Sequence, residues 1–253
     1  MSSFVSRILP GATAIALLGF VAAGSARANV TFDTTPSWDG SSSIQSWGYN
    51  PAFDPNGPTP TYGETFIAPT GSTVLNNFTF YIQSIDGNFN PAAGDQYAAQ
   101  GEVFNWTGSL LGGNPNQGTV GSALYTSPVF TFTSDGLFDA VTVTIPGGLA
   151  LTAGNAYVID LTDVAGPSNG DTGSWGDAEF GHVANDGGGG FAFSNVGQAG
   201  IWDDGGDFGD LAFTANFSSS GAVPDGANAA ILFVLALTAL GLVPSRRFAR
   251  VAR

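Results

Sequence analysis

Cysteine is absent from this chain of 253 residues, histidine occurs once, and lysine and arginine together number six. Without cysteine there are no disulfide bonds, which stabilise many secreted domains, and no thiolate ligands for zinc. A Ser-His-Asp triad would depend on His182, and no Gly-x-Ser-x-Gly motif accompanies that residue. The glutamates Glu64, Glu102 and Glu179 show no spacing that would pair two of them for glycoside hydrolysis. We therefore expect no catalytic site and no enzyme activity.

The few basic residues are confined to the two ends of the chain. All 20 aspartates and glutamates lie between residues 29 and 245, in a stretch with no lysine or arginine. Carboxylates there cannot form salt bridges with basic side chains, so each must be solvated or share a bound cation. The excess negative charge also repels nucleic acid and anionic membrane surfaces. The six basic residues are Arg7, Arg27, Arg246, Arg247, Arg250 and Arg253.

Residues 1–28 have the pattern of a secretory signal peptide. Arg7 supplies the positive charge that precedes an apolar run over residues 8–23. Ala26 and Ala28 then occupy the two small-residue positions of a signal-peptidase site. We expect a signal helix that is cleaved after Ala28, so that the mature chain is exported.

The C-terminal tail has three parts in a fixed order. A short motif, Val223-Pro224-Asp225-Gly226, precedes an uncharged apolar run over residues 227–243. A helix of that length reaches the lower end of what spans a bilayer, so we expect a transmembrane helix there. The arginines of the basic tip, residues 244–253, would keep that end in the cytoplasm. A buried core helix is the alternative. The arginines in question are Arg246, Arg247, Arg250 and Arg253.

This three-part order resembles the PEP-CTERM sorting tail of Gram-negative bacteria that produce exopolysaccharide, in its Val-Pro-Asp variant. The resemblance implies recognition of residues 223–226 by an exosortase-type membrane protease, in addition to signal peptidase at the N-terminus. It also implies a location at the cell envelope or cell surface, or outside the cell once the tail is cleaved. A simple membrane anchor that is never cleaved is the alternative interpretation.

The middle of the chain is rich in short runs that alternate between apolar and polar residues. This period of two predicts strands with one buried face at residues 78–82, 141–145, 157–161 and 211–217. Turn signals such as Asp-Gly and Asn-Pro separate the runs. We therefore predict an all-β domain over residues 29–217, an antiparallel β-sandwich or jelly roll, followed by a linker and the sorting motif at 218–226. Weaker strand candidates are 30–32, 63–67, 102–106, 129–132 and 191–193.

Two segments lack this alternation and are predicted as loops. Residues 33–61 are rich in Pro, Ser, Asp, Asn and Gly, and residues 165–210 are richer still. The domain as a whole resembles uncharacterised exported β-sandwich domains that often precede such tails. The resemblance rests on four sequence segments, residues 62–69, 76–82, 151–159 and 210–217.

Two kinds of ligand site are candidates in the folded part. A cluster of aspartates close to one another would bind Ca²⁺ or be solvated. Asp86, Asn88 and Asn90 have the spacing of a calcium loop, although Pro91 stands where an EF-hand requires glycine. Trp175 and Trp202 lie in Gly- and Asp-rich loops, where exposed rings would stack on sugars and buried rings would close the core. The clustered aspartates are Asp203, Asp204, Asp207 and Asp210.

Together these features predict an exported, acidic, non-enzymatic structural protein of the cell surface or of an exopolysaccharide-associated extracellular matrix. The alternative is a carbohydrate-binding module with a structural calcium ion. We expect the membrane, the two processing proteases and a polysaccharide as partners, and no nucleic acid.

Overall fold

The fold is seen in a computed structural model of the chain. The structure describes residues 29–49, 59–86, 88, 90–110, 118–165, 178–184, 189–195, 201–204 and 209–219. The predicted signal helix, the sorting motif, the transmembrane helix and the basic tip all lie outside these ranges. Within them, no helix has both the length and the apolar character needed to cross a membrane.

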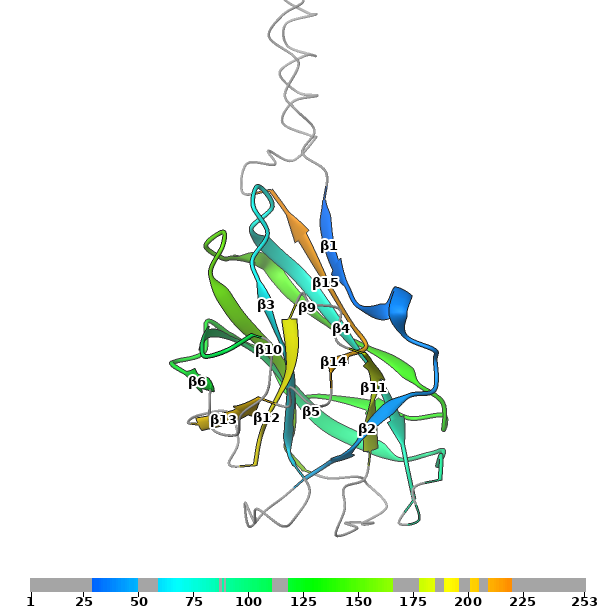
Figure 1. The fold of residues 1–253 in the computed structure, drawn as a ribbon. Helices are drawn as coiled ribbons and strands as arrows, with labels where there is room; N and C mark the ends of the chain where they lie inside the picture. Colours follow the sequence, from blue (N-terminus) through cyan, green and yellow to red (C-terminus); the bar gives the residue numbers. More distant parts are fainter. Residues whose placement is uncertain are drawn as a thin grey trace, which may run out of the picture.

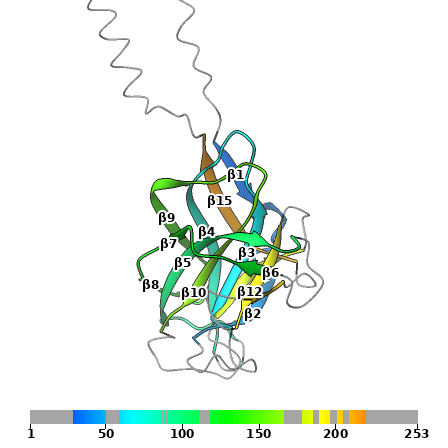
Figure 2. The same ribbon diagram turned by 90° about the vertical axis from the view of Figure 1, so that its left-hand side faces the viewer.

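The described chain forms two antiparallel sheets that share an apolar core (Figures 1 and 2). The all-β, antiparallel prediction is therefore confirmed. The first sheet has the order β1 (Val30–Asp33), β15 (Phe213–Ser218), β4 (Val74–Ser84), β11 (Ala178–Val183) and β14 (Asp210–Leu211), with β9 (Asp139–Ala150) on β4 and β2 (Ser43–Trp47) on β11. A single 3₁₀ turn, η1 (Thr35–Ser37), links β1 to β2.

The second sheet has eight strands. Its order is β10 (Ala156–Asp163), β3 (Thr61–Ile67), β12 (Gly189–Ser194), β13 (Ile201–Asp204), β6 (Gly118–Val120), β5 (Gln96–Thr107) and β7 (Tyr125–Thr126), with β8 (Phe130–Thr133) also on β5. Because β10 pairs with β5 as well as with β3, the path from β10 through β13 and β6 to β5 closes on itself. The sheet is therefore folded over one of its own faces.

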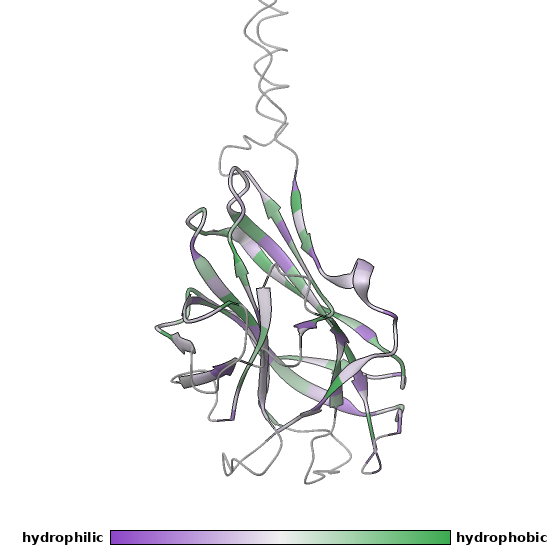
Figure 3. Cartoon of the chain, in the orientation of Figure 1, coloured by the Kyte–Doolittle hydropathy of each residue, from purple (hydrophilic) through white to green (hydrophobic). Residues whose placement is uncertain are grey.

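Three of the four alternating runs of the sequence lie within β4, β9 and β10, and the fourth, residues 211–217, is divided between β14 and β15. In β9, Val141, Val143 and Ile145 are buried, whereas the intervening Thr142 and Thr144 are exposed. Figure 3 shows hydrophobic and hydrophilic residues alternating along the strands of this sheet. Successive side chains of a strand point to opposite faces, so one face packs on the core and the other meets water.

Aromatic rings fill the core between the sheets. The Phe180 ring lies 5.3 Å from the rings of both Trp47 and Tyr62, and 5.5 Å from that of Phe80. Phe80 in turn lies 4.9 Å from Phe213 on the neighbouring strand. These tilted and edge-on contacts join both sheets in one apolar cluster. Each pair adds about 0.5–1.5 kcal/mol beyond the burial of its area.

The two segments predicted as loops contain four strands, so that prediction is wrong in part. Strand β2 falls within residues 33–61, and β11, β12 and β13 fall within 165–210. Strand β12 begins with Gly189 and Gly190, at positions where a side chain would not fit. A Cβ on Gly189 would lie 1.9 Å from the Thr65 carbonyl oxygen, and one on Gly190 would lie 2.6 Å from that of Leu110. Close approach to β3 and to residue 110 thus requires glycine, although glycine ordinarily weakens a strand.

A second apolar cluster lies on the face of the second sheet that is turned away from the main core. It consists of Phe104, Trp106, Val158, Ala192 and Trp202. Trp202 has no exposed surface, and its ring lies edge-on to Trp106 with centroids 6.3 Å apart. Strands β6 and β13 carry Gly118 and Trp202 over this face and thereby enclose it.

The packing of β6 against Trp106 predicts the effect of a single methyl group. A Cβ on Gly118 would lie 1.8 Å from the Trp106 ring, whereas one on Gly121 would meet nothing within 4 Å. We expect Gly118→Ala to lower the free energy of unfolding of the full-length chain by about 1–3 kcal/mol, since overpacking forces neighbours to move. Gly121→Ala, the matched control, should change it by less than about 0.5 kcal/mol. Urea unfolding followed by tryptophan fluorescence measures both; equal effects would contradict the enclosed cluster.

Candidate functional site

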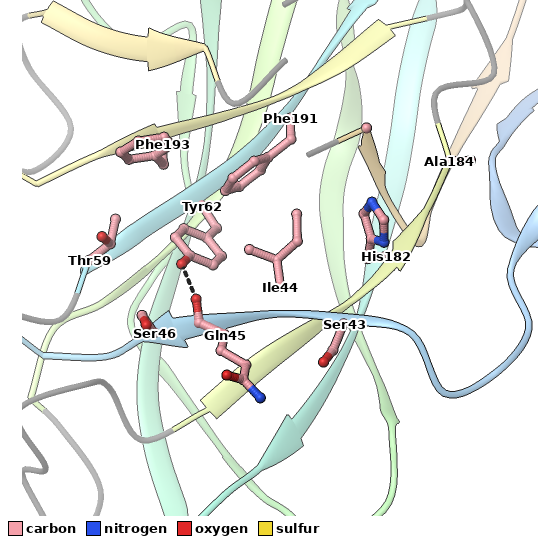
Figure 4. Close-up of a pocket in the computed structure, with 11 residues that line it drawn as sticks. Ser43, Ile44, Gln45, Ser46, Thr59, Tyr62, His182, Ala184, Phe191 and Phe193 are labelled. Carbon is pink, nitrogen blue, oxygen red and sulfur yellow. Dashed lines mark hydrogen bonds between the residues drawn. The ribbon is translucent and has the colours of Figure 1, made fainter. Parts of the chain in front are cut away.

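The best candidate for a binding site is a cleft of about 760 Å³ at the margin between the two sheets. Strands β2 and β11 of the first sheet and β3 and β12 of the second contribute to its walls (Figure 4). The lining residues are Ser43, Ile44, Gln45, Ser46, Thr59, Tyr62, His182, Ala184, Phe191, Phe193 and Gly209.

One wall of the cleft is aromatic. Phe191 and Phe193 lie two residues apart on β12, so they share a face, and their rings stack at 5.5 Å with an interplanar angle of 24°. The ring of Tyr62 stands edge-on to Phe191 at 4.8 Å. Phe191 is almost fully buried, whereas Phe193 is half-buried. Phe193 is therefore the ring of this wall with the most surface available to a ligand.

The opposite side of the cleft is formed by β2 and β11. Figure 4 shows Ile44 of β2 pointing toward the aromatic rings, with His182 of β11 beside it, whereas the side chains of Ser43 and Gln45 point away from the rings. The Ser43 hydroxyl donates to the Glu179 carboxylate at 2.8 Å. The side chain of Gln45 is exposed, so its amide is open to solvent. Aromatic rings that share a cleft with His182 and the hydroxyls of Ser46 and Thr59 suit an amphipathic ligand such as a sugar, which has apolar faces and polar edges.

A buried tyrosine joins the two walls. The Tyr62 hydroxyl on β3 donates to the backbone carbonyl of Gln45 on β2, across the boundary between the sheets (Figure 4). Burial raises the pKa of Tyr62 well above its ordinary value, so the phenol remains protonated and acts as a donor at all physiological pH values. Deeper in the core, the Trp47 indole donates at 3.3 Å to the Leu161 carbonyl of β10. These two bonds fix the separation of the sheets at the cleft.

The structure places the two tryptophans predicted for sugar stacking in different situations. Trp202 is fully buried in the second apolar cluster, so its ring has no free face for a sugar. The alternative interpretation, a tryptophan that closes the core, is the one that describes this residue. Trp175 lies outside the described residues.

The predicted aspartate cluster is divided between the sheets. Asp203 lies on β13 of the second sheet, and Asp210 is fully buried on β14 of the first. Asp204 belongs to β13, but its side chain is not described, and Asp207 lies outside the described residues. Across the ranges that the structure describes, no three His, Asp or Glu side chains form a group that could hold a metal ion.

The spacing of Asp86, Asn88 and Asn90 is explained by a turn. One oxygen of the Asp86 carboxylate accepts hydrogen bonds from the backbone N–H of Asn88 at 2.8 Å and from that of Asn90 at 2.9 Å. Backbone donation from Asn90 and Asn88 holds the pKa of Asp86 below its ordinary value. Aspartate commonly closes turns in this way.

Sequence reasoning missed both the cleft and a pair of buried acids. The cleft takes residues from strands that are far apart along the chain, and only the Phe191–Phe193 alternation gave a local signal. The alternation in β10 predicted Asp160 on a solvent face, yet Asp160 has no exposed surface, and Glu102 on β5 retains only 4%. Burial raises the pKa of the Asp160 carboxyl well above its ordinary value, and the charge of Glu102 opposite raises it further.

The bond between Tyr62 and Gln45 predicts a stability difference between two tyrosines. We expect Tyr62→Phe to lower the free energy of unfolding by about 1–2 kcal/mol, because a part-buried carbonyl loses its donor. Tyr125→Phe is the matched control, since its hydroxyl donates to the Thr144 carbonyl at 3.3 Å near the surface. That variant should change stability by less than about 0.5 kcal/mol. Urea denaturation of both variants tests this, and a Tyr62→Phe protein as stable as the wild type would refute it.

No protein-family model, curated protein or solved structure matches this chain. The residues and the geometry described above are therefore the basis for assigning a function.

Proposed function

We propose that the chain is an exported structural protein of the cell surface or of an exopolysaccharide-associated extracellular matrix, directed there by its C-terminal tail. The observation that carries this proposal is the distribution of charge. Every arginine lies in the predicted signal peptide or the basic tip, the chain has no lysine, and every acidic residue lies between those two ends. That distribution suits two membrane-directed ends that flank one acidic, water-facing domain.

The geometry of the domain supports attachment at one end. Val30 at the start of β1 pairs with Phe217 near the end of β15, so the first and last strands of the domain bring its two ends side by side (Figure 1). Strand β2, which lines the cleft, lies toward the opposite end in the same view. A membrane helix following β15 would thus hold the domain with its cleft directed away from the bilayer.

The processing of the tail can be tested by intact-mass measurement of the protein from the envelope and the culture medium of its native host. We expect a species that begins at Asn29 and ends near Asp225, recovered from the medium or the matrix. A variant with the four terminal arginines changed to glutamine should remain unprocessed. A mass from Asn29 to Arg253, found only in the membrane, would mean that the tail is a permanent anchor and not a cleaved signal.

A second candidate function is carbohydrate binding, favoured by the cleft. Its stacked phenylalanines share the cleft with His182 and the hydroxyls of Ser46 and Thr59, and aromatic stacking plus hydrogen bonding is how proteins hold sugar rings. Residues 29–245 carry many carboxylates and no lysine or arginine, so the domain would repel acidic polysaccharides. We therefore propose a neutral polysaccharide as the ligand of the cleft.

The carbohydrate proposal is tested by calorimetry with a panel of neutral and acidic oligosaccharides. We expect binding of a neutral glycan that Phe193→Ala weakens by at least ~10-fold, because that half-buried ring offers the largest free face. Phe130→Ala is the matched control, since Phe130 is also half-buried but lies on β8, away from the cleft. No binding across the panel, or equal binding by Phe193→Ala, would exclude the cleft as a glycan site.

A further inference from the structure

Glu102 and Asp160 face each other inside the folded-over second sheet. They are directly opposed in the antiparallel pairing of β5 with β10. Asp160 shares its face with Val158, and Glu102 shares its face with Phe104, and both of those apolar residues belong to the second cluster. The pair therefore lies on the face turned away from the main core, beside the compartment that β6 and β13 enclose.

The oxygens of this pair are largely without donors. Neither Asp160 oxygen has a hydrogen-bond partner, nor does Oε2 of Glu102, and all three atoms are buried in the described structure. Oε1 of Glu102 accepts a bond from the Thr126 hydroxyl at 2.6 Å. Buried carboxylate oxygens without donors are costly, because the water they have lost is not replaced.

No protein cation can balance the pair. The sequence contains no lysine or arginine between residues 28 and 245, and His182 lies on β11 of the other sheet. Two opposed carboxylates repel each other in a low-dielectric interior, and burial together with the charge of Glu102 raises the pKa of Asp160. Protons or a bound cation must therefore compensate the charge.

The backbone of β3 approaches closely beside Asp160. Gly63 on β3 is the neighbour of Asp160 on the side away from Glu102. A Cβ at Gly63 would lie 3.1 Å from the Asp160 Cβ and 2.7 Å from the Ile159 carbonyl oxygen. Glycine is therefore required here, and β3 places no side chain next to the Asp160 carboxylate.

We propose that Glu102 and Asp160 bind one divalent cation, Ca²⁺, between β5 and β10. Both residues supply hard oxygen ligands; the chain has no cysteine, and its one histidine lies on the other sheet, so no soft or imidazole ligand favours a transition metal. Ca²⁺ accepts six to eight oxygens in flexible geometry, and backbone carbonyls or enclosed waters complete its shell in proteins. The ion would join the two strands where no salt bridge can, and this role is independent of any ligand in the cleft.

The proposal is tested by calorimetry and thermal unfolding of the full-length chain in mild detergent, after chelation and then with added CaCl₂. We expect about one Ca²⁺ per chain and a rise of several degrees in the unfolding midpoint, because the ion binds only the folded state. Glu102→Gln and Asp160→Asn should each weaken binding by at least ~10-fold. Asp86→Asn is the control, because that exposed turn carboxylate should leave binding unchanged.

Either of two results would overturn the proposal. The first is that wild type shows no stoichiometric binding of Ca²⁺ and Asp160→Asn melts higher than wild type, as expected if the pair holds a proton. The second is that both substitutions leave binding unchanged. Should Asp160→Asn fail to fold, tryptophan-sensitised terbium emission decides the matter: the signal of the wild type should persist in Asp86→Asn and be lost in Glu102→Gln, and its persistence in Glu102→Gln would count against the site.

Discussion

The structure depends on accommodating carboxylates without a single lysine or arginine between residues 28 and 245. Backbone N–H groups and hydroxyls take the place of cations. Asp39 accepts bonds from the backbone of Ser42 and Ser41, and these donors hold its pKa far below the ordinary value. In the main core, Glu64 accepts the Leu211 N–H at 2.9 Å, which links the two sheets. Such bonds to charged acceptors are stronger than neutral ones and depend on geometry that only the assembled sheets provide. Neither oxygen of the buried Asp160 carboxylate accepts such a bond, and for this reason we infer an external ligand there.

The absence of disulfides is met by aromatic packing in two layers. The main core connects the sheets through rings such as Phe80 and Phe180, while Trp106 and Trp202 build a smaller cluster on the outer face of the second sheet. The second layer explains why β6 and β13, which are short, form strands at all: they are fixed by the tryptophans they cover. It also converts what would be a solvated face into an enclosed compartment, where buried polar groups become energetically important.

The sequence predicted the strands whose two faces differ and failed where both faces are covered. Alternation identified β4, β9, β10 and β15 because a hydrophobic face requires it, but period two cannot reveal a second layer over the other face. The alternation in β10 therefore predicts a solvated Asp160, whereas the second layer covers that face and buries it. Strands β2, β11 and β13 lack alternation, and β12 shows it only at Phe191 and Phe193, because their hydrogen bonds and burial come from distant neighbours, as the Gly189 contact with Thr65 illustrates. The cleft was equally hidden, because Tyr62, Phe193 and Ser43 meet only after both sheets have formed.

The proposed Ca²⁺ site would make the stability of this fold depend on export. Calcium sites of extracellular modules bind at about 10⁻⁴–10⁻³ M, far too weakly to be loaded at the calcium levels that cytosolic sensors read. A site with only two protein carboxylates belongs at that weak end, because affinity rises with the number of charged ligands. The pairing of β5 with β10 would then be stabilised only after the chain has crossed the membrane. An acid-rich domain without cations of its own would thus reach its full stability in the compartment to which its two ends direct it.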